Sequence, residues 1–419
     1  MGAVPGMQSG MTAQLWQQRR LLGVLAVLYF AQGLPSGLLA KAVPAMAREA
    51  GMPLQYIGLL ALAALPWALK FVWAPWVDRL GVRRAGHRKR WIIGCQLAAA
   101  SVLLLAAAVD SRLLFGEHFL ALLAILFLLN LCCATQDIAT DGLAVRMLPQ
   151  ALRGPGNSIQ VGGYKLGLIL GGGGLLIWIG VLGWTLTFVL VAVVLVLLLW
   201  PVARFPEPVA DVPSRPQLTL RWWLAELARF WGRPGMGWWL VLLLVYKVGD
   251  SFGSRMLKPF LVDSGWSLAA IGTLDLVTSL LGLAGAVLAG LLLMRISRVA
   301  GVIGFALAHA LAFLAWAWLA AQPAPAVWQI WLIASMEQIT DALATVVLFT
   351  MMMDHCRAGH EGSDYTLQAS VQLMAAGSFT LLSGFSAAWL GYSGHFLLAA
   401  GLGSLALMAA LLWWRARQS

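Results

Sequence analysis

Long apolar runs recur along the whole chain and are separated by short polar gaps. Each run is long enough to cross a bilayer as a helix, which takes about twenty residues. Several runs exceed that minimum, as expected for tilted helices. The pattern therefore predicts an all-α membrane protein with twelve spans, at residues 21–46, 54–76, 91–109, 119–147, 155–180, 183–200, 237–262, 267–294, 298–320, 326–353, 363–389 and 394–414.

The longest gap, from Pro201 to Gly235, divides the spans six and six. It is rich in Pro and Arg and contains an amphipathic piece at 222–231, which is typical of a helix lying on the membrane surface. We expect five parts in chain order: a cytoplasmic tail 1–20, a six-helix bundle 21–200, a linker 201–236, a second six-helix bundle 237–414 and a cytoplasmic tail 415–419.

The two halves share local sequence. Residues 137–144 (DIATDGLA) align without a gap with residues 337–344 (EQITDALA), and the acids occupy the same two places. Lys41 and Lys258 also correspond, each near the outer end of the first span of its half. Parallel six-span repeats joined by a long inner loop are the plan of major facilitator transporters, whose substrate site lies between the halves. We therefore expect that fold, with twelve transmembrane helices in two pseudo-symmetric six-helix bundles.

The repeated acids carry the candidate chemistry. Acids four residues apart share one face of a helix, and acids at bilayer depth are expensive and normally face a bundle interior or a watery cavity. Three interpretations stay open: structural ion pairing, proton coupling, and substrate binding by neighbouring cations. Lys165 and Lys247 reach comparable depths and are expected to balance these acids. The candidate coupling or gating set is Asp137, Asp141, Lys165, Lys247, Asp250, Glu337 and Asp341.

Three cations near the predicted outer mouth, Lys41, Arg255 and Lys258, would attract an anion, and Asp275 is their expected resting partner. His309 stands alone on an apolar face and is interpreted as a packing residue. Polar and aromatic residues on the cavity spans would stack on or hydrogen-bond a ring-bearing ligand. With the three cations, the candidate substrate contacts are Tyr29, Gln32, Tyr246 and Gln338.

The loop after the second span contains residues 74–84, APWVDRLGVRR. It resembles the major facilitator loop signature G-x-x-x-D-R-x-G-R-R, with Ala for the first Gly and one extra residue before the Arg pair. A carboxylate at a helix end beside several cations can latch neighbouring helices in one gating state; the plain alternative is positive charge that only orients the chain. The candidate inner-gate residues are Asp78, Arg79, Arg83 and Arg84.

Composition narrows the class of protein. With 61% hydrophobic and 11% charged residues, the chain is too apolar for an ordinary soluble domain. The net charge of +11 sits mostly in gaps on one side, which predicts both termini in the cytoplasm and argues against nucleic-acid binding. The four cysteines have no metal-type spacing, and the first apolar run is long enough to span, so we expect no metal site and no cleaved signal peptide.

Several stretches carry a resemblance to one family. They are residues 29–37 (YFAQGLPSG), 64–79 (ALPWALKFVWAPWVDR), 136–141 (QDIATD) and 246–250 (YKVGD). These stretches resemble the AmpG-like permeases, which import anhydro-muropeptides across the bacterial inner membrane. The sequences of the first two stretches are more similar to the RhtX/FptX siderophore permeases within that group. The chain lacks the extra C-terminal spans of many muropeptide permeases, which favours the siderophore branch.

The sequence thus predicts a bacterial inner-membrane secondary transporter that imports an anionic ferric siderophore by alternating access, driven by protons. The alternative is an AmpG-type anhydro-muropeptide permease, and a passive channel is a weaker one. No nucleophile and base set or metal motif suggests an enzyme, and no cofactor is expected. The expected partners are a small anionic solute, protons and the lipid bilayer, with no nucleic acid, and the chain is expected to act as a monomer.

Overall fold

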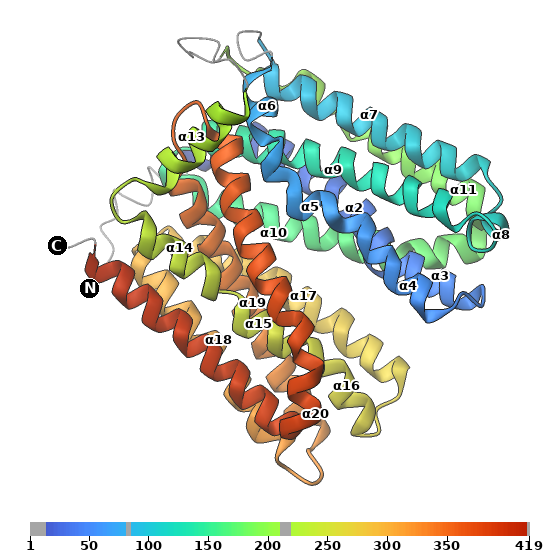
Figure 1. The fold of residues 1–419 in the computed structure, drawn as a ribbon, viewed down its shortest axis with the longest axis vertical. Coiled ribbons are helices and arrows are strands. Elements are labelled where there is room, and N and C mark those ends of the chain that lie inside the picture. The colour runs from blue at the N-terminus through green and yellow to red at the C-terminus, as the bar shows by residue number, and fades with distance from the viewer. Residues whose placement is uncertain (1–13, 81–84, 210–218, 417–419) are drawn as a thin grey trace. The chain divides into compact units, whose positions relative to one another are not determined.

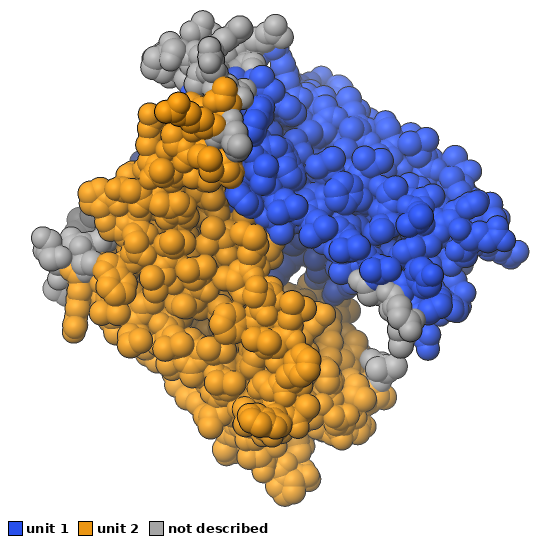
Figure 2. Space-filling model, viewed as in Figure 1, with its two compact units in different colours: residues 1–214, 356–366 blue, residues 215–355, 367–419 orange. Residues whose placement is uncertain are grey.

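The computed structural model describes residues 14–80, 85–209 and 219–416, and every regular element in these ranges is helical (Figure 1). The chain divides into two compact units (Figure 2). Unit 1 contains residues 1–214 together with Cys356–Thr366, and unit 2 contains Arg215–His355 together with residues 367–419. A short segment from the second half of the chain therefore belongs to unit 1.

Unit 1 holds the first six crossings. The first crossing begins with α2 (Arg19–Gly37), continues through a π-helical turn η1 (Leu38–Ala42) and ends with α3 (Val43–Glu49). The third and fourth are α7 (His87–Ala108) and α9 (Phe119–Met147), joined through the short α8 (Ser111–Leu114). After the turn η4 (Gln150–Leu152), the fifth and sixth comprise α10 (Arg153–Ile169), η5 (Leu170–Gly174), α11 (Leu175–Leu197) and α12 (Leu199–Arg204).

The second crossing is a series of short pieces rather than one helix (Figure 1). Proline has no N–H and its ring clashes with the preceding turn, so it breaks a regular helix. Pro66 and Pro75 each lie at the start of a new α-helical piece, directly after a tighter 3-10 stretch or turn. The pieces are α4 (Leu54–Leu59), η2 (Leu60–Ala64), α5 (Leu65–Leu69), η3 (Lys70–Val72) and α6 (Ala74–Arg79).

Unit 2 begins with the amphipathic α13 (Leu220–Trp231). The seventh crossing is again interrupted, as α14 (Met236–Val245), α15 (Val248–Gly253), η6 (Ser254–Met256) and α16 (Leu257–Asp263). It is followed by α17 (Leu268–Leu293), α18 (Arg298–Ala320), α19 (Val327–Asp354) and α20 (Glu361–Ala416).

Glycines mark two places where the chain turns between crossings. Gly391 inside α20 has φ 68° and ψ 173°, and Gly183 inside α11 has φ 76° and ψ 174°. This region of backbone space is essentially restricted to glycine. Figure 1 shows α20 turning back on itself, so it supplies two crossings. Eight helical segments within the described residues are long and apolar enough to span. With the turns at these two glycines and the interrupted second and seventh crossings, the predicted twelve-span plan is confirmed.

Glycines also allow α2 and α10 to pack backbone against backbone. A Cβ atom on Gly167 would lie 2.8 Å from the Cα of Gly33, and a Cβ on Gly37 would lie 2.6 Å from the backbone nitrogen of Gly172. Real Cβ atoms essentially never come this close to backbone atoms. The four-residue glycine spacing in the fifth span therefore serves close helix contact, as in other membrane helix pairs.

Replacing Gly167 by valine is expected to lower the free energy of unfolding by about 1–3 kcal/mol, because the new side chain has to push α2 and α10 apart. Gly23→Val is the matched control: Gly23 lies on α2, the other helix of the pair, and a Cβ there meets no atom within 4 Å. Unfolding of the two purified variants in detergent measures the difference, and equal stability would contradict the close contact.

Candidate functional site

The first buried charge cluster lies in unit 1 around the two acids of α9. Asp137 is 6% exposed and Asp141 is 1% exposed. Lys70 of η3 forms an ion pair with Asp137. Asp141 accepts hydrogen bonds from the Tyr29 hydroxyl at 2.8 Å and from Nε2 of Gln160 at 3.2 Å. Both acids are thus held by groups from other helices, and the two are held differently: one by a cation and the other by neutral donors.

Neutral polar side chains extend this cluster on both sides. Nε2 of Gln32 donates to the Thr140 hydroxyl at 3.2 Å, and the Tyr365 hydroxyl donates to Oε1 of Gln160 at 3.3 Å. Tyr365 belongs to the short segment of the second half that lies in unit 1. Tyr29 and Gln32, predicted as substrate contacts, are buried here with protein partners. Lys165 is half-buried on α10, and its role in balancing the acids stays a prediction.

Lys70, which forms the ion pair with Asp137, is not among the residues predicted from the sequence. Lys70 is 5% exposed and its Nζ also lies 5.3 Å from the centre of the Trp67 ring. The available signal was a lysine in the middle of an apolar span, where a charge needs a partner. The direction in which it faces was not readable, because the helix around it is broken.

The second charge cluster lies in unit 2 and is centred on a lysine. Nζ of Lys247 lies 2.7 Å from Oδ2 of Asp250 and 2.5 Å from Oδ1 of Asp341. Lys247 occupies the break between α14 and α15, where the helix is interrupted. The Thr345 hydroxyl adds a hydrogen bond to Asp341 at 3.2 Å. The predicted pairing of Lys247 with an acid of the second repeat is therefore present, and Asp250 shares the same ammonium group.

His309 belongs to this second cluster, so its interpretation as a packing residue was wrong. Its Nε2 lies 3.1 Å from Oδ1 of Asp250, and its Nδ1 lies 3.0 Å from the Thr340 hydroxyl. The apolar residues around His309 in sequence hid these contacts, because Asp250 and Thr340 come from other helices. Since the Thr340 hydroxyl can donate or accept, the ring can hold one or two protons with both contacts kept.

Glu337 stands apart from the ion pairs of this cluster. It is 2% exposed, and within the described residues its one hydrogen bond comes from Nε2 of the neighbouring Gln338, at 3.0 Å. A buried carboxyl without a cation is unusual, because burial of an unpaired charge is costly. Glu337 is therefore the acid whose surroundings differ most from those of Asp137, its counterpart in the repeat.

The predicted anion-attracting residues lie nearer the surface. Lys258 forms the expected ion pair with Asp275 at 3.1 Å, and the side chains are 60% and 35% exposed. Arg255 on η6 and Lys41 on η1 are exposed. Tyr246, also predicted to contact substrate, is 5% exposed and donates to the Val302 carbonyl at 3.1 Å. The cations are accessible, whereas the Tyr246 hydroxyl is already hydrogen-bonded within unit 2.

The loop motif forms a third cluster, at the end of α6 in unit 1. Nη1 of Arg88 donates to Asp78 at 2.7 Å, and Nη2 donates to Glu361 at 2.9 Å. The backbone N–H of Ser363 donates to Asp78 at 2.6 Å and its hydroxyl at 2.5 Å. The carboxylate thus sits at the first turn of α20, where unpaired N–H groups and the helix dipole favour an anion.

Two predicted members of this cluster, Arg83 and Arg84, lie outside the described residues. Arg79 contacts His360, with Nη2 2.7 Å from Nε2 of the ring. The cation that holds Asp78 is Arg88, at the start of α7, which the motif did not indicate. Glu361 and Ser363 were also missed, because they lie almost three hundred residues away in the chain.

Burial alone would raise the pKa of the Asp78 carboxyl, but the Arg88 guanidinium and the Ser363 donors outweigh burial and hold that pKa below its ordinary value. A carboxyl with a lowered pKa stabilises the folded protein above its unfolded pKa, about 4, and this contribution is lost as the pH falls through the folded pKa.

Asp78→Asn is therefore expected to lower the free energy of unfolding at neutral pH by about 1.5–3 kcal/mol, the usual range for hydrogen bonds to a charged group. As the pH falls below the ordinary aspartate pKa, about 4, the difference from the parent chain should shrink, because the parent carboxyl then loses its charge as well. Unfolding of purified protein across this pH range measures both effects. Glu117→Gln, at an exposed loop position, is the control; a pH-independent gap for Asp78→Asn would argue against the charge as the cause.

Solved structures share the fold of this chain. The structure of the Escherichia coli fucose:proton symporter matches with a TM-score of 0.72, covering 94% of this chain and 98% of the symporter at 14% identity. A bacterial homologue of the iron transporter ferroportin, in its outward-facing state, matches with a TM-score of 0.69, covering 96% and 99% of the two chains at 16% identity. The chain therefore shares the fold of these two transporters, which is the major facilitator fold predicted from the sequence.

Proteins similar in sequence indicate a more specific group than the structural matches do. The anhydromuropeptide permease of Escherichia coli K12 is 28% identical over 364 residues, covering 85% of this chain and 72% of the permease. The protein called AmpG 4 in Rickettsia conorii is 24% identical over 395 residues, covering 92% and 94%. The family model described as acetyl-coenzyme A transporter 1 matches residues 21–178. The chain is thus similar in sequence to AmpG-like permeases, and the predicted placement in the siderophore branch is not shown.

Proposed function

We propose that this protein imports an anhydro-muropeptide, a sugar bearing a short acidic peptide, across a bacterial inner membrane by alternating access coupled to protons. The observation that carries the substrate class is the similarity to the anhydromuropeptide permease over 85% of the chain. The sequence analysis favoured a ferric siderophore and kept this substrate as the alternative. The similarity to the anhydromuropeptide permease favours the anhydro-muropeptide over the siderophore.

The exposed cations suit such a solute. An anhydro-muropeptide carries peptide carboxylates, and Lys41, Arg255 and Lys258 are accessible to them. Lys258 is paired with Asp275 at the surface, where ion pairs contribute little and are easily exchanged for another anion. A substrate carboxylate would replace Asp275 at this lysine at low cost.

The buried clusters support coupling to protons. Lysines or neutral donors hold the four buried aspartates Asp137, Asp141, Asp250 and Asp341. Glu337 pairs with no cation within the described residues. A buried carboxyl in that situation is more stable when it holds a proton. Glu337 would carry the proton, and the His309, Asp250 and Lys247 contacts beside it would rearrange when the proton leaves.

The Asp78 cluster would act as the inner-gate latch. It fastens Gly362 and Ser363 to α6 and α7 within unit 1. The helix that begins there, α20, continues into unit 2. Breaking the Asp78 contacts would release this helix end, which is the step that the proposal assigns to opening.

Uptake by cells that lack their own permeases tests the substrate class. Cells expressing this chain are offered either labelled anhydro-disaccharide peptide or a labelled ferric siderophore of the pyochelin or rhizobactin type. The proposal expects accumulation of the sugar peptide alone, abolished by collapse of the proton gradient. Accumulation of the iron chelate without the sugar peptide would restore the siderophore interpretation, and equilibration without accumulation in proteoliposomes under a pH gradient would indicate a passive channel.

A further inference from the structure

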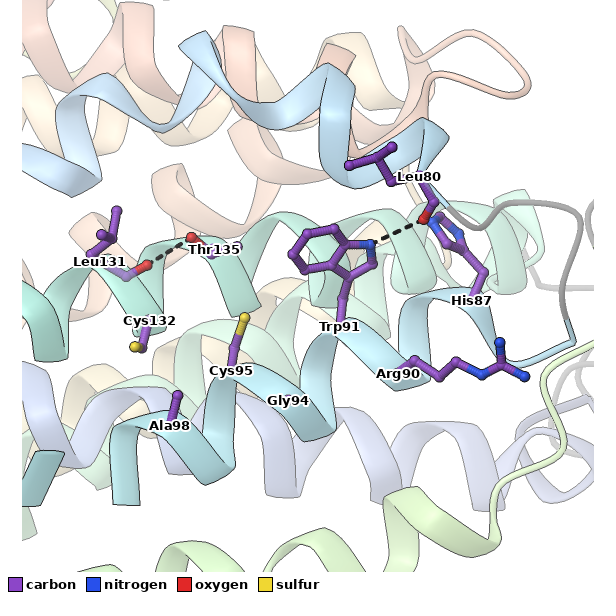
Figure 3. A pocket seen from close by; sticks show the side chains of 10 residues that line it. All are labelled: Leu80, His87, Arg90, Trp91, Gly94, Cys95, Ala98, Leu131, Cys132 and Thr135. Carbon is purple, nitrogen blue, oxygen red and sulfur yellow. Dashed lines mark hydrogen bonds between the residues drawn. The ribbon is translucent and has the colours of Figure 1, made fainter. Parts of the chain in front are cut away.

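A groove of about 510 Å³ lies on unit 1 between α7 and α9 (Figure 3). Its His87 end adjoins the cluster of Asp78 and Arg88. Along α7 it runs from His87 to Ala98, a rise of about 16 Å at 1.5 Å per residue. The deeper part is lined by small or apolar groups, among them Gly94, Cys95 and Leu131. One end is basic, because Arg90 lies there beside the His87 imidazole. The groove therefore combines an apolar channel with a basic end.

His87 is the first sign that this end takes a ligand. The side chain is 3% exposed, yet neither ring nitrogen has a hydrogen-bond partner within the described residues. The Val77 carbonyl approaches the ring without completing a hydrogen bond of normal geometry. Buried polar groups are almost always paired, and the Val77 carbonyl could serve only one of the two ring nitrogens, so the other nitrogen requires an explanation. A ligand oxygen in the groove would supply a partner.

Uncompensated charge is the second sign. Arg90 is exposed and forms no hydrogen bond or ion pair with any residue of the described ranges. The nearby acids are already occupied: Asp78 holds Arg88, and Glu207 accepts from the backbone N–H groups of Arg88 and Lys89 at 3.1 and 2.8 Å. The basic end thus attracts an anion, and no carboxylate in the described part of the chain pairs with Arg90.

Position in the membrane selects the kind of anion. The helix that carries His87 and Arg90 is a membrane span over His87–Ala108, and these two residues are at its end, beside the loop that the charge pattern places in the cytoplasm. Trp91, whose indole N–H reaches the Leu80 carbonyl at 3.4 Å, lies at the same level, as interfacial tryptophans do. An anion at this depth with an apolar channel behind it matches the phosphate and one acyl chain of a phospholipid.

We propose that the α7/α9 groove binds one anionic phospholipid, with its phosphate between Arg90 and His87 and an acyl chain along Gly94, Cys95 and Leu131. Basic pockets between membrane helices on the cytoplasmic side are known to hold acidic lipid headgroups in this way. None of the residues that line the groove belongs to the candidate substrate contacts or to the candidate coupling residues, so this proposal does not depend on which solute is carried.

Native mass spectrometry of the purified full chain in mild detergent tests the proposal. The probes are phosphatidylglycerol and phosphatidylcholine with identical acyl chains, and glycerol 3-phosphate as a headgroup without chains. One tightly retained phosphatidylglycerol is expected. Equal retention of the two lipids would show annular lipid only, and displacement by glycerol 3-phosphate at similar concentrations would show a small-anion site; either result overturns the proposal.

Two variants and two controls locate the lipid. Arg90→Gln is expected to weaken phosphatidylglycerol binding about five- to tenfold through loss of one charged contact. Gly94→Phe should abolish it by filling the channel, and a Cβ at Gly94 meets no atom within 4 Å, so folding should be preserved. Arg20→Gln and Gly180→Phe are the matched controls, an exposed arginine near another helix end and a glycine with equally open space. Unchanged binding by Arg90→Gln would overturn the assignment even if Gly94→Phe failed to fold.

Discussion

Replacing Lys247 by methionine is expected to abolish uptake and to lower the free energy of unfolding by about 3–5 kcal/mol, the usual result of removing one partner of a buried ion pair. Lys247 lies between Asp250 and Asp341, at 2.7 and 2.5 Å, and its side chain is 10% exposed. Without the ammonium group, two carboxylates would remain close together in a buried site. Unfolding of the purified variant and uptake in cells measure the two effects.

A double variant separates charge from shape. In Lys247→Met with Asp341→Asn, one carboxylate is removed with the lysine and the other, Asp250, keeps its contact with His309. We expect most of the lost stability to return, while uptake remains abolished. Lys258→Met is the matched control, because the Lys258 and Asp275 pair is largely exposed and such pairs contribute at most about 1 kcal/mol. Full uptake and unchanged unfolding in the Lys247 variant would remove this cluster from the mechanism.

Glu337→Gln is expected to end accumulation while leaving exchange intact. Glutamine has nearly the shape of glutamic acid and can keep the contact with Gln338, so the stability should change little. It cannot load and release a proton. Solute should therefore equilibrate across the membrane without being concentrated, and counterflow of labelled solute against unlabelled solute should continue.

Proteoliposomes with an imposed pH gradient measure this difference, through solute accumulation and proton uptake recorded together. Glu49→Gln, at an exposed position, makes the same chemical change away from the clusters and should transport normally. Asp341→Asn provides a second comparison, since Asp341 is held by Lys247 and its loss should reduce exchange as well. Concentrative uptake with full proton movement in Glu337→Gln would show that another group carries the proton.

The two clusters are not copies of each other, although their sequences repeat. In the first repeat the ion pair forms at the first acid, Asp137, with a lysine of the second crossing. In the second repeat it forms at the second acid, Asp341, with a lysine of the seventh crossing. The remaining acids, Asp141 and Glu337, are held by neutral donors. Acids at equivalent positions of the two repeats thus have different electrostatic surroundings, which suits a division between structural and proton-carrying roles.

The sequence by itself determined the class of fold. Apolar runs of about twenty residues leave the backbone no arrangement in a bilayer other than helices, so the spans could be counted directly. The repeated acids located both buried clusters along the chain, because charge at bilayer depth is rare and costly. Glycines at four-residue spacing in the fifth span are typical of close helix contact, and the structure shows that the partner is the first span.

Only the tertiary structure decided the partners of these charges. An α-helix turns 100° per residue and a 3-10 helix 120°, so the five residues of η2 shift the facing direction of Lys70 by about 100° from that of a regular helix. Periodicity therefore could not show that Lys70 reaches Asp137. His309 with Asp250 and Asp78 with Ser363 are joined across long stretches of chain, and nothing in the local sequence encodes such distances. Charge cost dictates that partners must exist, and packing chooses which residues they are.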